Sequence, residues 1–169
     1  SSAASDVYKR QVLCLTYGTC VGGAIVRGGA IYHGTNWSAG EFGMIYMNGE
    51  YYENIASVTR LVEQAKSMDA SLYDGRAITA RLNRSDVYAL VDGWAKQVAE
   101  GLASLIHIFN PACMIIGGGI MENKDVFNMV TSKVSELTAP GFDVNIRSAR
   151  FGNSAGLIGA GILAQKLMK

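Results

Sequence analysis

Short apolar runs at the start of the chain predict strands. They cover residues 12–16, 22–26 and 30–33, and Arg27-Gly28-Gly29 supplies a tight turn between the last two. Three strands so close together in the sequence predict an antiparallel meander.

Residues 1–11 are polar, carry no period and join abruptly to the first strand. Two interpretations stay open on composition: a junction-like leader, or a short disordered native terminus. The predicted domain therefore starts at residue 12 and extends to residue 169.

Apolar residues at steps of three and four predict helices in the middle of the chain. The first runs from about Asn54 to Ser67, and a shorter one lies near Arg76 to Leu82. A long core helix follows, capped by Ser85-Asp86. It ends before Asn110-Pro111, because the residue preceding a proline disfavours helix.

The second half alternates strands and helices. Strands are predicted over residues 113–116 and 144–149, and a closing helix over residues 155–168. Asn123 is expected to cap an amphipathic helix between the two strands. Its predicted inward residues are Val126, Phe127, Val130, Val134 and Leu137. A meander followed by alternating helices and strands predicts an α/β fold, with a mixed sheet and helices packed on it.

Composition narrows the possible partners. The 169 residues fit one domain, and 15 basic against 14 acidic residues give a net charge of +1 with no basic run. We therefore expect no nucleic acid and no membrane as partners. Three cysteines, no apolar run of about 20 residues and no signal-peptide core predict a cytoplasmic protein.

Three glycine clusters lie beside predicted elements, at residues 15–23, 115–119 and 152–159. Glycine lets the backbone turn sharply and present N–H groups to phosphate oxygens. One such cluster alone is more typical of a hairpin turn. The order and spacing of all three indicate a nucleotide site.

These clusters belong to an ordered set of motifs that resembles the ROK family of repressors and sugar kinases. The motifs are Leu15 to Gly23, Ser38-Ala39-Gly40-Glu41-Phe42-Gly43, Asn110-Pro111, Ile116 to Ile120 and Gly152 to Ala160. The resemblance spans nearly all of residues 12–169. It implies the C-terminal lobe of a kinase with the actin-like, ribonuclease H-like ATPase fold, closest to the hexose or β-glucoside kinase branch.

The resemblance implies nucleotide contacts in the first cluster. Gly18 and Thr19 would form the second phosphate loop, with the Thr19 hydroxyl facing the phosphates of ATP. Gly22 and Gly23 would let the backbone approach those phosphates.

The second cluster would lie on the adenosine side, through Gly118 and Gly119. Three glycines after a strand leave a wall without side chains. Without the resemblance, close packing of a helix explains this pair equally well. Magnesium is expected with ATP because it bridges the phosphates, but no protein ligand for it can be named.

Two glutamates are the candidates for sugar binding, since a carboxylate can hold adjacent hydroxyl groups. Glu41 matches the sugar-contacting glutamate of the family's Gly-Glu-x-Gly motif, and Glu53 resembles the second one. The alternatives are a solvated loop residue for Glu41 and an acid at a helix N-terminus for Glu53.

The chain departs from zinc-bearing relatives. Met44 stands where they have a histidine, and residues 45–52 contain no cysteine or histidine. We therefore expect no zinc, and we interpret His33 and His107 as structural because neither has a partner at metal spacing.

No catalytic base is assigned. Phosphoryl transfer needs a carboxylate that accepts the proton of the attacking hydroxyl. In the family this aspartate lies upstream of the second phosphate loop, and Asp6 lacks the motif around it. The resemblance implies that the N-terminal lobe is missing from this chain, which we expect to be inactive alone.

Three functions stay open: an ATP-dependent sugar kinase, a sugar-responsive transcriptional repressor of the same family, and a non-catalytic sugar-binding or dimerising remnant. An upstream aspartate base would favour the kinase, and an upstream DNA-binding domain the repressor. A homodimer is expected from the resemblance alone.

Overall fold

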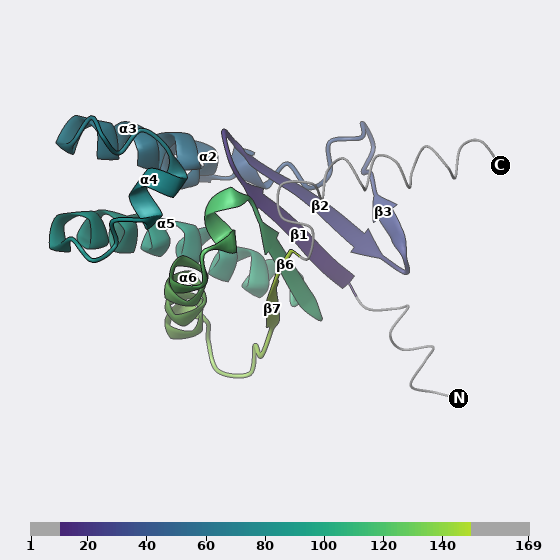
Figure 1. The fold of residues 1–169 in the computed structure, drawn as a ribbon. Helices are drawn as coiled ribbons and strands as arrows, with labels where there is room; N and C mark the ends of the chain where they lie inside the picture. Colours follow the sequence, from purple (N-terminus) through teal and green to yellow (C-terminus); the bar gives the residue numbers. More distant parts are fainter. Residues whose placement is uncertain (1–10, 150–169) are drawn as a thin grey trace.

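A five-stranded mixed sheet forms the centre of the computed structural model, which describes residues 11–149 (Figure 1). The strands lie in the order β3-β2-β1-β6-β7. Their bounds are Gln11–Tyr17 for β1, Val21–Arg27 for β2, Ala30–Tyr32 for β3, Cys113–Gly117 for β6 and Asn145–Ser148 for β7. The first three are antiparallel neighbours, and β6 runs parallel to both β1 and β7.

The predicted meander is confirmed. Gly28 and Gly29 both have positive φ, 61° and 78°, which a two-residue hairpin turn requires. The turn places Arg27 opposite Ala30. The predicted strands over residues 113–116 and 144–149 are confirmed as β6 and β7, whereas the closing helix and the third glycine cluster lie outside the described residues.

Helices cover one face of the sheet and the carboxyl ends of β1 and β6. Their bounds are Tyr52–Ala56 for α2, Val58–Met68 for α3, Gly75–Thr79 for α4, Ser85–Phe109 for α5 and Lys124–Leu137 for α6. Two 3₁₀ turns, η1 at Phe42–Met44 and η2 at Gly119–Glu122, complete this layer. None of the helices within residues 11–149 is long and apolar enough to cross a membrane.

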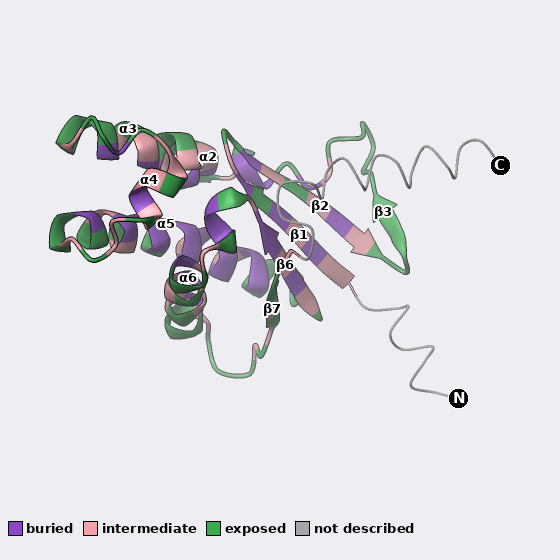
Figure 2. Cartoon of the chain, viewed as in Figure 1, coloured by how far each residue is buried: buried purple, intermediate pink, exposed green. Residues whose placement is uncertain are grey.

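The core lies between the sheet and α5. Leu13, Leu15 and Tyr17 of β1 are buried, while Cys14 is half-buried and Thr16 is exposed, as expected for a strand covered by helices on one face. Figure 2 shows buried positions along much of α5 and along the central strands. The prediction of a main core helix is therefore confirmed.

The predicted helix over residues 54–67 is wrong in two respects: it begins at Tyr52, and it breaks at Ser57. Ser57 has extended backbone angles, φ −68° and ψ 154°, and its side chain accepts a hydrogen bond from the Arg60 N–H. It therefore caps a new helix, α3. Glu53 consequently lies in the first turn of α2 and not before the helix.

Three smaller predictions need correction. The helix near residues 76–82 is α4, which ends at Thr79, and Leu137 is exposed where an inward position was predicted. Ser85 is the first residue of α5 and not its cap.

Arg84, directly before α5, pairs with both Asp69 and Asp86. The hydrogen bond from the Arg84 guanidinium holds the pKa of the Asp69 carboxyl well below its usual range.

A small hairpin that the sequence analysis did not predict joins η1 to α2. Its strands are β4 at Tyr46–Met47 and β5 at Glu50–Tyr51. Asn48 and Gly49 form its turn with φ of 54° and 86°, and the Asn48 amide donates to Glu100 of α5 over 3.3 Å. An Asn-Gly pair between apolar residues is a strong hairpin signal, so the sequence did carry this information.

Two glycines of α5 are expected to respond in opposite ways to alanine. A Cβ at Gly93 meets nothing within 4 Å, whereas one at Gly101 would overlap the Tyr52 ring. We expect Gly93→Ala to raise the free energy of unfolding by about 0.5–1 kcal/mol through helix propensity. Gly101→Ala should lower it by roughly 1–3 kcal/mol through overpacking. Urea denaturation of both variants checks this pair, and equal effects would contradict the packing of Tyr52 on α5.

Candidate functional site

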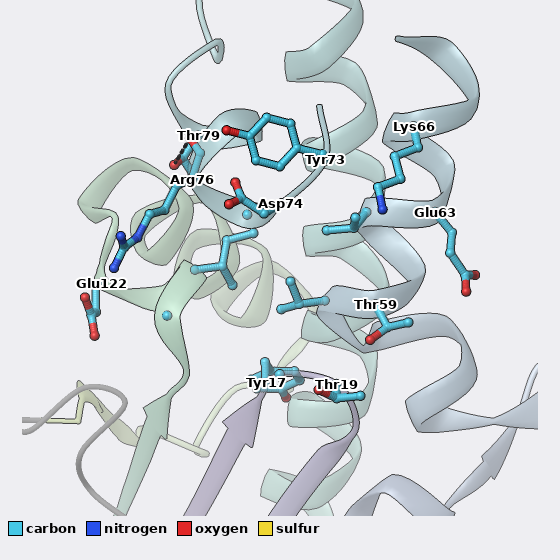
Figure 3. Close-up of a pocket in the computed structure, with 16 residues that line it drawn as sticks. Tyr17, Thr19, Thr59, Glu63, Lys66, Tyr73, Asp74, Arg76, Thr79 and Glu122 are labelled. Atoms are coloured by element: carbon cyan, nitrogen blue, oxygen red, sulfur yellow. Dashed lines mark hydrogen bonds between the residues drawn. The ribbon is translucent and has the colours of Figure 1, made fainter. Parts of the chain in front are cut away.

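A cavity of about 620 Å³ opens beyond the carboxyl end of β1 (Figure 3). Its walls come from the turn after β1, from α3, from the segment that begins α4, and from η2. Figure 3 shows Thr19 on one side of the cavity and Tyr73 on the opposite side. Ligands commonly bind at the carboxyl ends of strands in α/β folds.

The turn after β1 is held by backbone hydrogen bonds. The Gly18 N–H donates to the Cys20 carbonyl over 3.0 Å, and the Gly18 carbonyl accepts from the Val58 N–H over 2.8 Å. Val58 is the first residue of α3, so the bond ties the turn to that helix. The side chain of Thr19 remains exposed and lines the cavity.

The two glycines predicted for the adenosine side differ in their surroundings. Gly118 has φ 108°, and a Cβ there would overlap the Tyr17 carbonyl oxygen. The backbone after β6 thus lies directly against the end of β1, which only glycine permits. Gly119 is exposed and lines the cavity together with Gly18 and Thr19.

Charged side chains surround the cavity. Lys66 of α3 and Arg76 of α4 enter from opposite sides, and Glu63, Asp74 and Glu122 also line it (Figure 3). One carboxylate oxygen of Asp74 is engaged, since it accepts the Ala77 N–H over 2.7 Å. The lining thus has three carboxylates and two cations, so it has no excess of positive charge. The two cations can still form charge-assisted hydrogen bonds with an anionic ligand such as a phosphate chain.

A second, smaller cavity of about 360 Å³ adjoins the first. Glu50, Glu53 and Asn54 line it on one side. Its lining shares Thr19, Thr59 and Glu63 with the larger cavity. Two ligands, one in each cavity, would therefore meet near Thr19.

Glu41 lines neither of these two cavities. It is exposed and directly precedes η1. A Cβ at Gly43 would lie 2.5 Å from the Val21 carbonyl oxygen and 3.0 Å from the Glu53 carboxylate. The absence of a side chain at Gly43 therefore lets η1 pack against β2 and Glu53, which brings the turn that carries Glu41 close to Glu53.

Gly22 and Gly23 lie within β2, and neither lines the two cavities described above. A Cβ at Gly23 would overlap the Phe42 ring and the Gly40 carbonyl oxygen, and one at Gly22 would lie 3.0 Å from the Thr16 hydroxyl. Packing therefore explains why both positions are glycine. Their contact with phosphates stays a prediction.

Buried tyrosines lie beneath the Gly18-Thr19 turn. The hydroxyls of Tyr17 and Tyr52 are 2.8 Å apart, and both side chains are fully buried. Burial raises the pKa of each above its ordinary value, so both hydroxyls are neutral near pH 7.

The two histidines lie away from the cavities. His107 accepts a hydrogen bond from the Ala139 N–H over 3.0 Å, and the His33 ring packs on Trp37 at 4.1 Å. Within residues 11–149 no three side chains of the metal-binding types are grouped so that they could hold an ion.

Sequence reasoning missed Lys66, Tyr73 and Arg76. Lys66 belongs to a helix whose apolar spacing explains its sequence without a ligand. That pattern does not show that α4 folds back over α3 and encloses the space between them.

Comparisons with known proteins show which family the chain is similar to. The model of the ROK family matches residues 3–167. A glucokinase from Halalkalibacterium halodurans is 32% identical, covering 93% of this chain and 57% of its own length. A β-glucoside kinase from Listeria innocua is 30% identical, covering 88% and 54%. The chain thus spans about half the length of these curated relatives.

A solved structure extends the comparison to bound ligands. A ROK family glucokinase from Streptomyces griseus, in complex with glucose and AMPPNP, superimposes with a TM-score of 0.79 at 25% identity. The alignment covers 94% of this chain and 61% of that protein. The fold is that of the actin-like ATPase sugar kinases, as the sequence analysis predicted.

Proposed function

The chain belongs to the ROK family, and we propose that the protein containing it transfers the γ-phosphoryl group of ATP to a hydroxyl of a hexose or β-glucoside. The observation that supports this most is the pair of adjoining cavities that share Thr19. A kinase needs two neighbouring sites, one for each substrate, and relatives include glucokinases and β-glucoside kinases.

ATP occupies the larger cavity in this proposal. The Gly18-Thr19 turn and the Thr19 hydroxyl face the phosphates, and Gly119 lies against the adenosine. Lys66 and Arg76 balance the phosphate charge from either side. Magnesium bound to the ATP phosphates would supply further charge neutralisation there, and no protein ligand for it is assigned.

The sugar occupies the smaller cavity. Glu53 lines it directly. Glu41 lies two residues before Gly43, the glycine that packs against Glu53. In this proposal the Glu53 carboxylate accepts hydrogen bonds from sugar hydroxyls inside the cavity, and the Glu41 carboxylate, which does not line it, accepts them from the part of the sugar that extends beyond it. Together they orient the acceptor oxygen toward the γ-phosphorus.

The reaction forms a bond between the sugar oxygen and the γ-phosphorus and breaks the bond from that phosphorus to the β–γ bridging oxygen, releasing ADP. The hydroxyl proton passes to a carboxylate base. By family resemblance this base is an aspartate, which we propose is supplied by an N-terminal lobe of the whole protein. Homodimerisation stays a prediction from the same resemblance.

Sugar-dependent ADP release tests the proposal. The product of the complete gene is assayed with ATP and a panel of hexoses and β-glucosides, with ATP alone as the control. The proposal predicts ADP release that requires one class of sugar. Release that no sugar stimulates would contradict it, and a DNA-binding domain in the complete gene would then favour the repressor.

A further inference from the structure

The break between α2 and α3 is held by one side chain from a distant part of the chain. The indole N–H of Trp94, in α5, donates to the Ala56 carbonyl over 3.0 Å and to the Ser57 carbonyl over 3.2 Å. Trp94 is 1% exposed. A helix break leaves carbonyl groups without partners in the helix, and burial makes such groups costly. The indole satisfies the Ala56 carbonyl and shares the Ser57 carbonyl with the Leu61 N–H of α3, which donates to it over 3.3 Å. It thereby fixes the break.

The same break connects the two cavities. On its N-terminal side α2 carries Glu53, which lines the smaller cavity. On its C-terminal side the first amide of α3, from Val58, donates to the Gly18 carbonyl in the turn that carries Thr19. A shift of the break would therefore move a wall of the sugar cavity and the phosphate turn together.

Two buried tyrosines reinforce this connection. The Tyr52 hydroxyl donates to the Val98 carbonyl of α5 over 2.7 Å. Since a phenol has one proton, the 2.8 Å bond between the two hydroxyls must be donated by Tyr17. The Tyr17 ring also meets the Trp94 ring edge to face, with centroids 6.4 Å apart. The end of β1, α2 and α5 are thus linked by a chain of satisfied, buried groups.

We propose that Trp94, supported by Tyr17 and Tyr52, is a positioning residue that keeps the Gly18-Thr19 turn and Glu53 at a fixed separation. It touches neither substrate. Its effect is to hold the phosphoryl donor and the sugar hydroxyl in line, and the proposal rests on the kinase function given above. Misplacement of reacting groups by about 1 Å can cost 100-fold in rate, so the arrangement matters for turnover more than for binding.

Trp94→Phe in the complete gene product tests the kinetic consequence, because it keeps a buried ring and removes the indole donor. We expect kcat to fall about 10- to 100-fold, with both KM values within about twofold, at a temperature where the variant is fully folded. Trp37→Phe is the matched control, since Trp37 is the other tryptophan and is 78% exposed. A folded Trp94→Phe variant with unchanged kcat would overturn the proposal.

Amide hydrogen exchange separates this proposal from the proposed function. In Trp94→Phe without ligands, exchange should rise at residues 18–20 and 53–58 together, while the middle of α5 stays protected. Exchange that rises at only one segment, or at neither, would overturn the proposal whatever the activity. If the wild-type protein lacks sugar-dependent ADP release, the kinase function fails, and this exchange result alone decides whether Trp94 couples the two segments.

Discussion

Glu41→Gln in the complete gene product is expected to weaken sugar binding by roughly 30- to 150-fold. A hydrogen bond to a charged group contributes about 1.5–3 kcal/mol and one between neutral groups about 0.5–1.5 kcal/mol. A carboxylate that holds two hydroxyls would therefore lose about 2–3 kcal/mol on becoming an amide. The affinity for a non-hydrolysable ATP analogue should stay within about twofold, because in the proposed arrangement Glu41 contacts the sugar and not the nucleotide.

Calorimetric titration with sugar and, separately, with the ATP analogue measures both effects. Glu136→Gln serves as the matched control, since Glu136 is an exposed glutamate on α6. Unchanged sugar affinity in Glu41→Gln would remove Glu41 from the sugar site, and equal loss for both ligands would point to a folding defect.

Gly118→Ala is expected to cause the largest loss of stability among the glycine substitutions considered. A side chain at φ 108° and ψ 151° adopts a region essentially restricted to glycine, at a cost of about 1–3 kcal/mol. The Cβ would also overlap the Tyr17 carbonyl oxygen, so the backbone of β1 or η2 must move. We expect the free energy of unfolding to fall by about 4 kcal/mol or more.

Gly141→Ala isolates the conformational part of this cost. Gly141 has φ 92°, and a Cβ there meets nothing within 4 Å. Chemical denaturation should therefore show a loss of only about 1–2 kcal/mol for this variant. Equal losses in the two variants would mean that the backbone at Gly118 does not lie as close to the Tyr17 carbonyl as described.

The same contact affects the ligand site. Gly118→Val pushes on Tyr17, which directly precedes the Gly18-Thr19 turn. We expect a tenfold or greater loss of affinity for the ATP analogue in calorimetry under conditions where the variant is folded, since the phosphate turn would be displaced. An unchanged dissociation constant would contradict the placement of the phosphates at the Gly18-Thr19 turn.

Elements with a strong local period could be predicted from the sequence. The meander and α5 agree with the pattern because their apolar residues alternate, or recur in steps of three and four, over the whole element. The break at Ser57 could not be predicted. The apolar spacing continues through Ile55, Val58 and Leu61, and the break depends on an indole 37 residues further along the chain.

The candidate site was partly predictable because some of its residues belong to sequence motifs. Gly18, Thr19 and Gly119 follow strands and belong to motifs, and the structure brings them to one cavity. Lys66 and Arg76 belong to no motif, and only the tertiary packing of α4 on α3 turns them toward the same space. The β4–β5 hairpin could have been predicted from Asn48-Gly49, because this pair is a strong hairpin signal, but no hairpin was inferred from it.

A crystal structure of the complete gene product with a non-hydrolysable ATP analogue and its preferred sugar is the most direct test of the two-cavity account. The account predicts the phosphates beside Gly18 and Thr19, the adenosine against Gly119, and the sugar hydroxyls on the carboxylates of Glu41 and Glu53. A nucleotide bound elsewhere, or a sugar that contacts neither glutamate, would contradict it.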